Sequence, residues 1–435
     1  MQQKNRAKFF LTLVIFSLTG QIAWVVENMY FNVFIYKMFG ASAADISLMV
    51  ASSAVSATLT TLFIGALSDK LGKRRVFMCG GYILWGISII AFCFIRTDVI
   101  GALFPAVSAS AVCITLVIIM DCVMTFFGSS ANDACFNAWL TDMTDSSDRG
   151  AAEGINSMMP LVAILAVFGG FMAFDLGKSE SWTAIFAIIG AVVVLIGIIG
   201  FFIISEPKLE VSKNQNYFAN IFYGFRPSVI KDNKMLYLFL AAFAVFGISI
   251  QIFMPYLIIY YTATLKMDNY VFIMAPAIVL ASVFTAFWGR VYDKVKFKKS
   301  ALPALALLML GYVLLYFFRG TALIFVGSLL MMCGYLAGSA VFGAVIRDNT
   351  PANRAGMFQG LRIAFQVLLP GIIGPAIGSA ILKNAETIVN DDGTTSFLPN
   401  ENIFLAALAV ALVLTVLLFV IFKFTKQRAE VKNEN

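Results

Sequence analysis

The stretch GALSDKLGKRR at residues 65–75 is followed, 224 positions later, by the related stretch GRVYDKVKFKK at residues 289–299. Each copy follows a long apolar run and precedes another, and each contains an aspartate followed by a basic cluster. Self-similarity of this kind is typical of a duplicated architecture. The pair therefore predicts a chain of two related halves, each with a short polar turn between two apolar segments.

A second internal match supports the duplication and locates an insertion. Asp142 and Thr144 are echoed by Asp348 and Thr350, at an offset of 206 residues. This offset is 18 residues shorter than that of the first pair, so the first half carries extra chain between its third and fifth apolar segments. We expect an additional external element near residues 96–112.

The composition requires an apolar solvent. Of the 435 residues, 60% are hydrophobic and only 13% are charged. A soluble protein carries a much larger charged fraction, and this chain has too little polar surface to cover its apolar residues in water. An α-helix crosses the hydrocarbon with roughly 20 mostly apolar residues. We therefore predict twelve spans, near 9–36, 43–67, 76–95, 108–139, 151–174, 182–204, 236–263, 269–292, 300–318, 321–346, 355–383 and 402–424.

The basic residues predict the orientation of the spans. With an even number of crossings, 24 of the 31 Lys and Arg residues fall on the side of the two termini and six on the other, while Arg362 lies inside a span. Because cytoplasmic loops are enriched in basic residues, both termini are expected in the cytoplasm. The net charge of +7 then reflects topology and anionic lipid headgroups, and gives no reason to expect nucleic acid. The chain contains no N-x-Ser/Thr sequon, which favours a bacterial-type inner membrane.

The two related stretches carry a family resemblance. GALSDKLGKRR resembles the signature between the second and third helices of the major facilitator superfamily, and the second copy lacks its inner glycine. The resemblance implies an all-α membrane fold of two six-helix bundles related by pseudo-two-fold symmetry. It also implies that charged residues at the cytoplasmic face stabilise one state of an alternating-access cycle, and the candidates for this gating role are Asp69, Arg74, Asp142, Arg149, Asp293, Asp348 and Arg354.

The longest polar segment divides the chain. We expect an N-terminal bundle at 1–204, a cytoplasmic linker at 205–235, and a C-terminal bundle with a short tail at 236–435. Tyr217, Phe218, Ile221, Phe222 and Phe225 recur at helical spacing, which predicts an amphipathic helix on the membrane interface within the linker.

Ionisable residues inside spans are costly and thus indicate function. Glu27 lies midway along the first span and borders a stripe formed by Gln21, Trp24, Asn28 and Asn32. Amides and carboxylates bind hydroxyl groups and an indole stacks on a sugar face, so this stripe favours a polyhydroxyl ligand, although interhelical hydrogen bonding would explain the same residues. Glu27 can also take up a proton, since burial favours the neutral form of a carboxyl group. Asp121 in the fourth span is a second candidate for coupling.

The second half offers a less charged set of ligand candidates. Gln251 and Tyr256 lie in the seventh span, and Arg362 and Gln366 share one face of the eleventh. Arg362 is near enough to the cytoplasmic end to extend towards the interface, or to pair with Asp348 or Glu153.

A finer resemblance concerns the branch of the superfamily. Residues 21–32, the sequence NAWLTD at 137–142 with Arg149, and the segment 348–354 resemble the glycoside–pentoside–hexuronide (melibiose-permease-like) and sucrose-transporter-like symporters. The melibiose branch coordinates sodium with carboxylates in the second helix, where this chain has Ser52, Ser53 and Ser56. We therefore expect proton coupling, with sodium as the alternative.

The resulting prediction is a monomeric importer of a sugar or glycoside, driven by protons, in which the two bundles rock around a site near the midplane. Proton-driven efflux of amphipathic drugs and a non-transporting membrane sensor are the alternatives. Histidine is absent, and the six cysteines show no C-x-x-C spacing, so neither a metal site nor a cofactor is expected. The sequence contains no nucleophile–base or Gly-rich phosphate motif, and an enzyme is not predicted.

Overall fold

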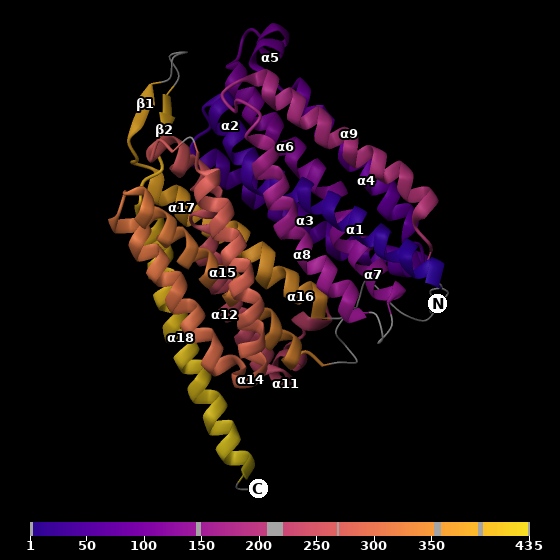
Figure 1. The fold of residues 1–435 in the computed structure, drawn as a ribbon, viewed down its shortest axis with the longest axis vertical. Helices are drawn as coiled ribbons and strands as arrows, with labels where there is room; N and C mark the ends of the chain where they lie inside the picture. The colour runs from indigo at the N-terminus through magenta and orange to yellow at the C-terminus, as the bar shows by residue number, and fades with distance from the viewer. Residues whose placement is uncertain are drawn as a thin grey trace. The chain divides into compact units, whose positions relative to one another are not determined.

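The computed structural model describes residues 3–144, 149–206, 221–267, 269–351, 358–389 and 395–433. The chain forms two compact units (Figure 1), and each is described separately. The N-terminal unit comprises Met1–Phe222 with Val389–Ser396, and the C-terminal unit comprises Tyr223–Ile388 with Phe397–Asn435.

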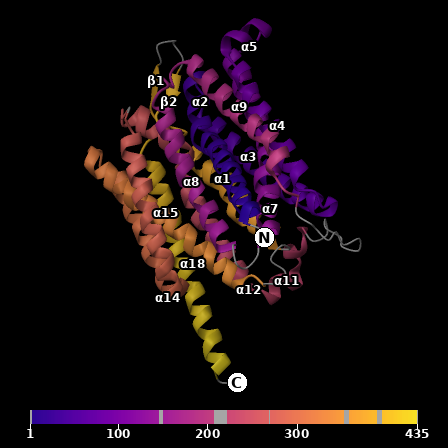
Figure 2. The same ribbon diagram turned by 45° about the vertical axis from the view of Figure 1, so that its right-hand side comes forward.

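The N-terminal unit contains six apolar helical segments long enough to cross a membrane. Their elements are α1 (Gln3–Val25), the π-helix η1 (Val26–Tyr30), α2 (Phe31–Phe39), α3 (Ala43–Leu71), α4 (Arg75–Ala91), the 3-10 helix η2 (Phe92–Phe94), α5 (Thr97–Leu103), α6 (Ala109–Gly128), the π-helix η3 (Ser129–Phe136), α7 (Asn137–Met143), α8 (Arg149–Phe171) and α9 (Ser179–Ile203). Helix α1 packs against α8 and α9, α3 packs against α6, and α4 packs against α9 (Figures 1 and 2).

The C-terminal unit also provides six spans from its described residues. Its helices are the 3-10 helix η4 (Tyr223–Phe225), α11 (Pro227–Asp232), α12 (Lys234–Gln251), the 3-10 helix η5 (Met254–Tyr256), α13 (Leu257–Ile259), the π-helix η6 (Tyr260–Thr264), α14 (Val271–Phe317), α15 (Thr321–Asn349), α16 (Gln359–Ile363), the π-helix η8 (Ala364–Leu368), α17 (Leu369–Leu382) and α18 (Asn402–Asn433). The strands β1 (Thr387–Val389) and β2 (Thr395–Phe397) fall where the chain passes from one unit to the other. The 47-residue α14 changes direction at Lys296, whose backbone is not helical, and so supplies two spans.

Local sequence explains where the spans of the first repeat begin and end. Helix α3 starts with a capping box, in which Asp45 N donates to Ser42 Oγ at 3.2 Å and Ser42 N donates to Asp45 Oδ2 at 2.8 Å. It ends at Gly72, which adopts the left-handed conformation (φ 63°) that glycine tolerates without steric cost. The inner glycine of GALSDKLGKRR therefore makes the tight turn into α4.

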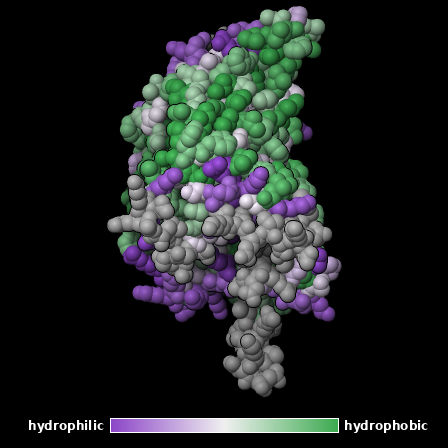
Figure 3. All heavy atoms as spheres, turned by 90° about the vertical axis from the view of Figure 1, so that its right-hand side faces the viewer, coloured by the Kyte–Doolittle hydropathy of each residue, from purple (hydrophilic) through white to green (hydrophobic). Residues whose placement is uncertain are grey.

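The surface of the helices matches a hydrocarbon solvent. Large apolar side chains are exposed on most spans, for example Phe202 (79%), Val416 (64%) and Phe272 (63%). Figure 3 shows one face of the molecule, where hydrophobic side chains form a broad region bordered by hydrophilic ones. The predicted all-helical membrane fold is confirmed, and the extra element of the first half is the short helix α5.

Two features differ from the sequence prediction or lie beyond it. The two-stranded sheet of β1 and β2 lies between the last two spans, in a segment for which no strand was predicted. In the predicted amphipathic helix, Tyr217 and Phe218 lie outside the described residues, whereas Phe225 belongs to a short 3-10 turn.

Candidate functional site

Glu27 lies where three helices of the N-terminal unit meet. It is carried by the π-helix η1, and its side chain is 7% exposed. Ser53 Oγ on α3 is hydrogen-bonded to Glu27 Oε1 at 2.8 Å, and Thr125 Oγ1 on α6 is hydrogen-bonded to the same oxygen at 2.7 Å. The two hydroxyl oxygens are themselves 2.8 Å apart. π-Turns frequently occur at functional positions because they redirect side chains, and η1 places Glu27 towards α3 and α6.

Asp121 forms a second buried carboxyl next to this cluster. It precedes Thr125 by one turn of α6 and is 2% exposed. It interacts electrostatically with Glu27 and through a side-chain hydrogen bond with Ser53. Among the described residues, Glu27 Oε2 and Asp121 Oδ1 lack a hydrogen-bond partner, and neither residue forms an ion pair with a lysine or arginine. Two buried acids without a cation are suited to holding a proton or another small cation.

The residues of the predicted polar stripe in the first span differ in how far they are exposed. Asn28 is exposed, and its Nδ2 donates to the Trp24 carbonyl at 2.8 Å. Asn32 is 1% exposed, and its Nδ2 donates to the Asn28 carbonyl at 3.2 Å. Gln21 and Trp24 are partly exposed. The stripe differs from the prediction because the π-turn interrupts the spacing of three and four residues that was assumed for a regular helix.

Aromatic rings lie beside the carboxyl cluster. The rings of Trp24 and Trp85 are 4.9 Å apart, and Gly128 lies against both. A Cβ atom on Gly128 would come within 2.7 Å of the Trp85 ring, so only glycine admits the two indoles here. Asp133 of η3 accepts from Ser129 Oγ at 2.9 Å and also interacts with Trp24. The arrangement brings together Trp24, Trp85 and Asp133, which come from three different spans.

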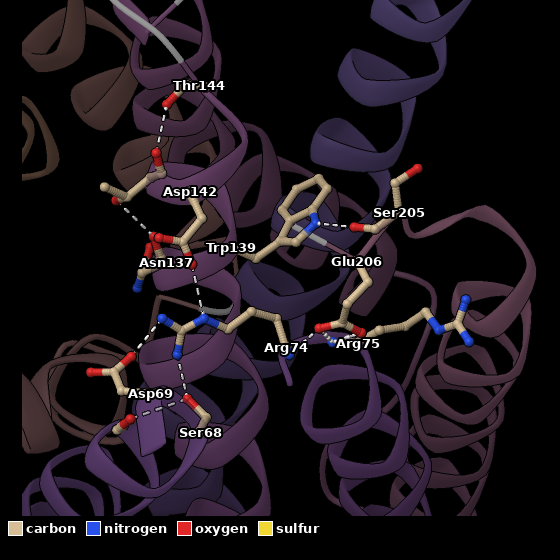
Figure 4. Close-up of polar contacts among 12 residues, drawn as sticks. Ser68, Asp69, Arg74, Arg75, Asn137, Trp139, Asp142, Thr144, Ser205 and Glu206 are labelled. Carbon is tan, nitrogen blue, oxygen red and sulfur yellow. Dashed lines mark hydrogen bonds and ion pairs between the residues drawn. The ribbon is translucent and has the colours of Figure 1, made fainter. Parts of the chain in front are cut away.

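A charged cluster occupies the end of the unit that contains the Gly72 turn (Figure 4). Arg74, which is 5% exposed, pairs with Asp69 Oδ1 at 2.5 Å through Nη2 and with Asp142 Oδ2 at 2.9 Å through Nε. Its Nη1 donates to Ser68 Oγ at 2.5 Å. Burial lowers the pKa of Arg74, but the two carboxylates outweigh this effect, and the pKa lies above its usual value. The guanidinium thus joins the α3–α4 turn to the end of α7 as a permanent charge.

Glu206 extends this cluster and was not predicted. Its carboxylate accepts from the backbone N–H groups of Arg74 and Arg75, at the first turn of α4 (Figure 4). Trp139 Nε1 donates to the neighbouring Ser205 carbonyl at 3.1 Å. Arg149, the other predicted gating residue here, begins α8, and its side chain lies outside the described residues. Glu206 lies 131 residues beyond Arg75 in the chain, so no local sequence pattern indicates this contact.

The second copy of the motif is built differently. Asp348 accepts from the Tyr292 hydroxyl at 2.7 Å, and it forms no ion pair with an arginine in the part of the chain that the structure describes. Asp293 is exposed, and no ion pair to it is found among the described residues. Arg354 lies outside the described residues. Among its described residues, the copy therefore holds one aspartate through a tyrosine hydroxyl.

The ligand candidates of the C-terminal unit lie in two places. Tyr256 is fully buried, and its hydroxyl donates to the Pro375 carbonyl at 3.4 Å, while Gln251 packs against Gly374. Arg362 Nε donates to Gln366 Oε1 at 3.1 Å. The structure therefore brings Arg362 and Gln366 together, and it does not pair Arg362 with Asp348.

Within the described ranges, no group of three or more histidine, cysteine, aspartate or glutamate side chains could hold a metal ion. Beside Glu27, the hydroxyl groups of Ser53 and Thr125 complete the described contacts of its carboxyl group.

Comparisons with known proteins show which family has this architecture. The family model of the Major Facilitator Superfamily matches residues 9–375 and, in a second match, residues 281–435. The glucose transporter GlcP of Staphylococcus epidermidis is 26% identical over 175 residues, which are 40% of this chain and 35% of that relative. The matched segment thus spans little more than a third of the glucose transporter.

Solved structures agree over almost the whole chain. A point mutant of the nucleoside transporter NupG superposes with a TM-score of 0.71 at 14% identity, covering 95% of this chain and 99% of that one. A bacterial homologue of the human lysosomal transporter Spinster, inward-facing and occupied, gives 0.71 at 15% identity, with 97% and 98% covered. The xylose transporter XylE from E. coli gives 0.68 at 13% identity, with 94% and 98% covered. At these identities the likeness shows the fold. With the family match over most of its length, the chain is a multi-pass membrane transporter and belongs to the major facilitator superfamily.

Proposed function

We propose that this transporter imports a sugar or glycoside together with protons, by alternating access, and that Glu27 carries the coupling proton. The observation that carries the proposal is the Glu27 cluster. A carboxyl group that is 7% exposed inside a span, bonded to two hydroxyls and lacking a described cationic partner, is stable in its neutral form and can ionise when the site opens to water.

The groups around Glu27 support a polyhydroxyl substrate. The Trp24 indole offers an apolar face to a sugar ring, and the partly exposed Gln21 and exposed Asn28 offer amide donors and acceptors. The partial match to a glucose transporter and the fold shared with a xylose transporter favour the same class. The fold is shared equally with a nucleoside transporter, whose substrate also contains a pentose, so nucleosides belong among the compounds to be tested.

The proposed branch, coupling ion and orientation are supported by sequence patterns alone. The segments 21–32 and 137–142 favour the melibiose-permease-like branch. Serines replace the carboxylates of the second span, and this favours protons over sodium. The distribution of basic residues favours cytoplasmic termini in a bacterial-type inner membrane.

The experiment that tests the proposal uses purified protein in proteoliposomes that contain a pH-sensitive dye. A panel of monosaccharides, disaccharides and nucleosides is added outside, with sodium absent and then present. We expect one class of sugar to acidify the lumen without sodium, because protons enter with the substrate. The response should be lost in Glu27→Gln, which keeps the shape of the side chain but cannot ionise.

Two outcomes would contradict the proposal. Proton movement on adding amphipathic cations, with none on adding any sugar, would identify a drug antiporter. Uptake of a sugar that requires sodium and moves no protons would assign the site to sodium.

A further inference from the structure

The cluster around Glu27 contains more hydrogen bonds than its hydroxyl hydrogens can supply. Glu27 Oε1, Ser53 Oγ and Thr125 Oγ1 form a triangle whose edges measure 2.8, 2.8 and 2.7 Å. Each edge lies in the range of an O–H···O hydrogen bond, and each such bond requires one hydrogen. Each of the two hydroxyls supplies one, and an ionised carboxylate supplies none. The third hydrogen has to come from a proton on Glu27.

The surroundings do not supply a substitute for that proton. Asp121 on α6 and Asp133 on η3 both interact with Glu27, and both are acidic. Cys122, the other titratable neighbour on α6, is neutral as a thiol. If Glu27 were ionised, both hydroxyls would donate to it, and their oxygens would face each other at 2.8 Å without a hydrogen between them.

We propose that Ser53 and Thr125 are positioning residues that close a three-membered hydrogen-bonded ring with protonated Glu27, so that Glu27 itself carries a proton while the ring is closed. This inference rests on the proposed role of Glu27 in proton coupling. The ring also links protonation to helix packing. When the proton leaves, both hydroxyls turn towards the carboxylate, since charge-assisted hydrogen bonds are stronger, and the Ser53–Thr125 bond between α3 and α6 is lost.

Infrared spectroscopy of the purified protein tests the ring without any transport measurement. A protonated carboxylic acid has a C=O stretching band that shifts to lower wavenumber in D₂O and is absent from carboxylates and amides. We expect Glu27→Gln to remove one such band and Asp121→Asn to leave that band in place. We expect Thr125→Val and Ser53→Ala to move the band to higher wavenumber, because Glu27 then loses one of its hydrogen-bond partners.

Matched controls separate the ring from general disturbance. Thr115 is also on α6 but is exposed, and its hydroxyl donates to the Ala111 carbonyl, so Thr115→Val should leave the band unchanged. Thr125→Ser keeps the hydroxyl and should return the band close to its wild-type position, which a merely structural role for the threonine methyl would not do.

The inference is overturned if the wild-type protein at neutral pH shows no band that Glu27→Gln removes. The inference is also overturned if Asp121→Asn removes the band that Glu27→Gln removes. A band that does not move in Thr125→Val and Ser53→Ala would overturn the inference as well. These results are distinguishable from a failure of the proposed function, because the band is read without substrate. A ring detected in a protein that moves no protons with any sugar would contradict the transport proposal alone.

Discussion

At the scale of single residues, the Arg74 cluster depends on one buried cation. Arg74→Gln would leave Asp69 and Asp142 without their partner, and it would remove the bond to Ser68. Hydrogen bonds to charged groups contribute roughly 1.5–3 kcal/mol each where they are buried, and both carboxylates here are partly exposed, so we expect a loss near the lower figure for the cluster. The melting temperature in detergent should fall, and substrate uptake should fall with it.

The neighbouring Arg75 is the matched control for this prediction. Its Nε has no hydrogen-bond partner among the described residues, and Arg75→Gln preserves the backbone N–H that donates to Glu206. Uptake and melting temperature should therefore stay close to wild type. Equal losses in the two variants would show that the positive charge of the turn matters, and not the contacts of Arg74.

Glu206 permits a second prediction at this scale. Its carboxylate accepts from the first N–H groups of α4 and lies at the positive end of the helix dipole. Loss of such a cap costs about 0.5–2 kcal/mol, so Glu206→Ala should lower the melting temperature measured by differential scanning fluorimetry. Glu180, in the first turn of α9, is exposed, and Glu180→Ala should have a smaller effect. A larger effect for Glu180 would contradict the cap.

Some of these residues could be predicted from the sequence, and others could not. Glu27 and Asp121 stand out because carboxyls are costly inside an apolar span. Ser53 and Thr125 do not, because hydroxyls in membrane helices commonly bond to their own backbone, as Ser52 does with the Leu48 carbonyl at 2.8 Å. Glu206 could not be predicted because its partners are distant in sequence.

At the scale of elements, the second copy of the repeated motif stores strain. Lys296 occupies the position that corresponds to Gly72 at the offset of 224 residues, and its φ is 59° with ψ of −175°. This region is accessible almost only to glycine, and a residue held there costs about 1–3 kcal/mol. We expect Lys296→Gly to raise the melting temperature, because glycine removes the strain.

Lys298→Gly provides the control, since Lys298 lies in the helical part of α14 and has no positive φ. There glycine should destabilise the protein by about 0.5–1 kcal/mol. Destabilisation by Lys296→Gly of the same size would contradict a strained turn at Lys296.

The packing of α6 against the two indoles gives a further prediction. Gly128→Ala places a Cβ atom 2.7 Å from the Trp85 ring, and overpacking of this kind costs typically about 1–3 kcal/mol. Uptake should fall as well, because Trp24 is displaced next to Glu27. Gly80 on α4 has open space around it, so Gly80→Ala should be tolerated. Unchanged uptake and melting temperature in Gly128→Ala would show that the indoles are free to move.

The membrane-spanning helices could be predicted where the apolar runs of the sequence are long and continuous. The long fourth apolar segment forms a single 35-residue span, Ala109–Met143, and the π-helix η3 lies within it. The π-turns at η1 and η3 were not predicted, since they arise from how neighbouring helices pack and not from a local residue pattern.

At the scale of the whole molecule, the repeat and the apolar runs together predicted the fold. The 18-residue difference between the two offsets correctly indicated the additional helix α5. The substrate could not be predicted in this way, because a fold shared by nucleoside and xylose transporters does not determine specificity. Specificity depends on a few side chains, and the side chains around Glu27 are those that we propose for this role.

The role of Glu27 as the proton carrier is tested by comparing two modes of transport in Glu27→Gln proteoliposomes. One is exchange of labelled for unlabelled sugar at equal pH, and the other is sugar accumulation driven by a pH gradient. Because glutamine imitates the protonated carboxyl, we predict that exchange continues while gradient-driven accumulation is abolished. Accumulation that persists in Glu27→Gln would contradict the role of Glu27 as the proton carrier, and loss of exchange together with accumulation would contradict the separation of proton coupling from sugar binding.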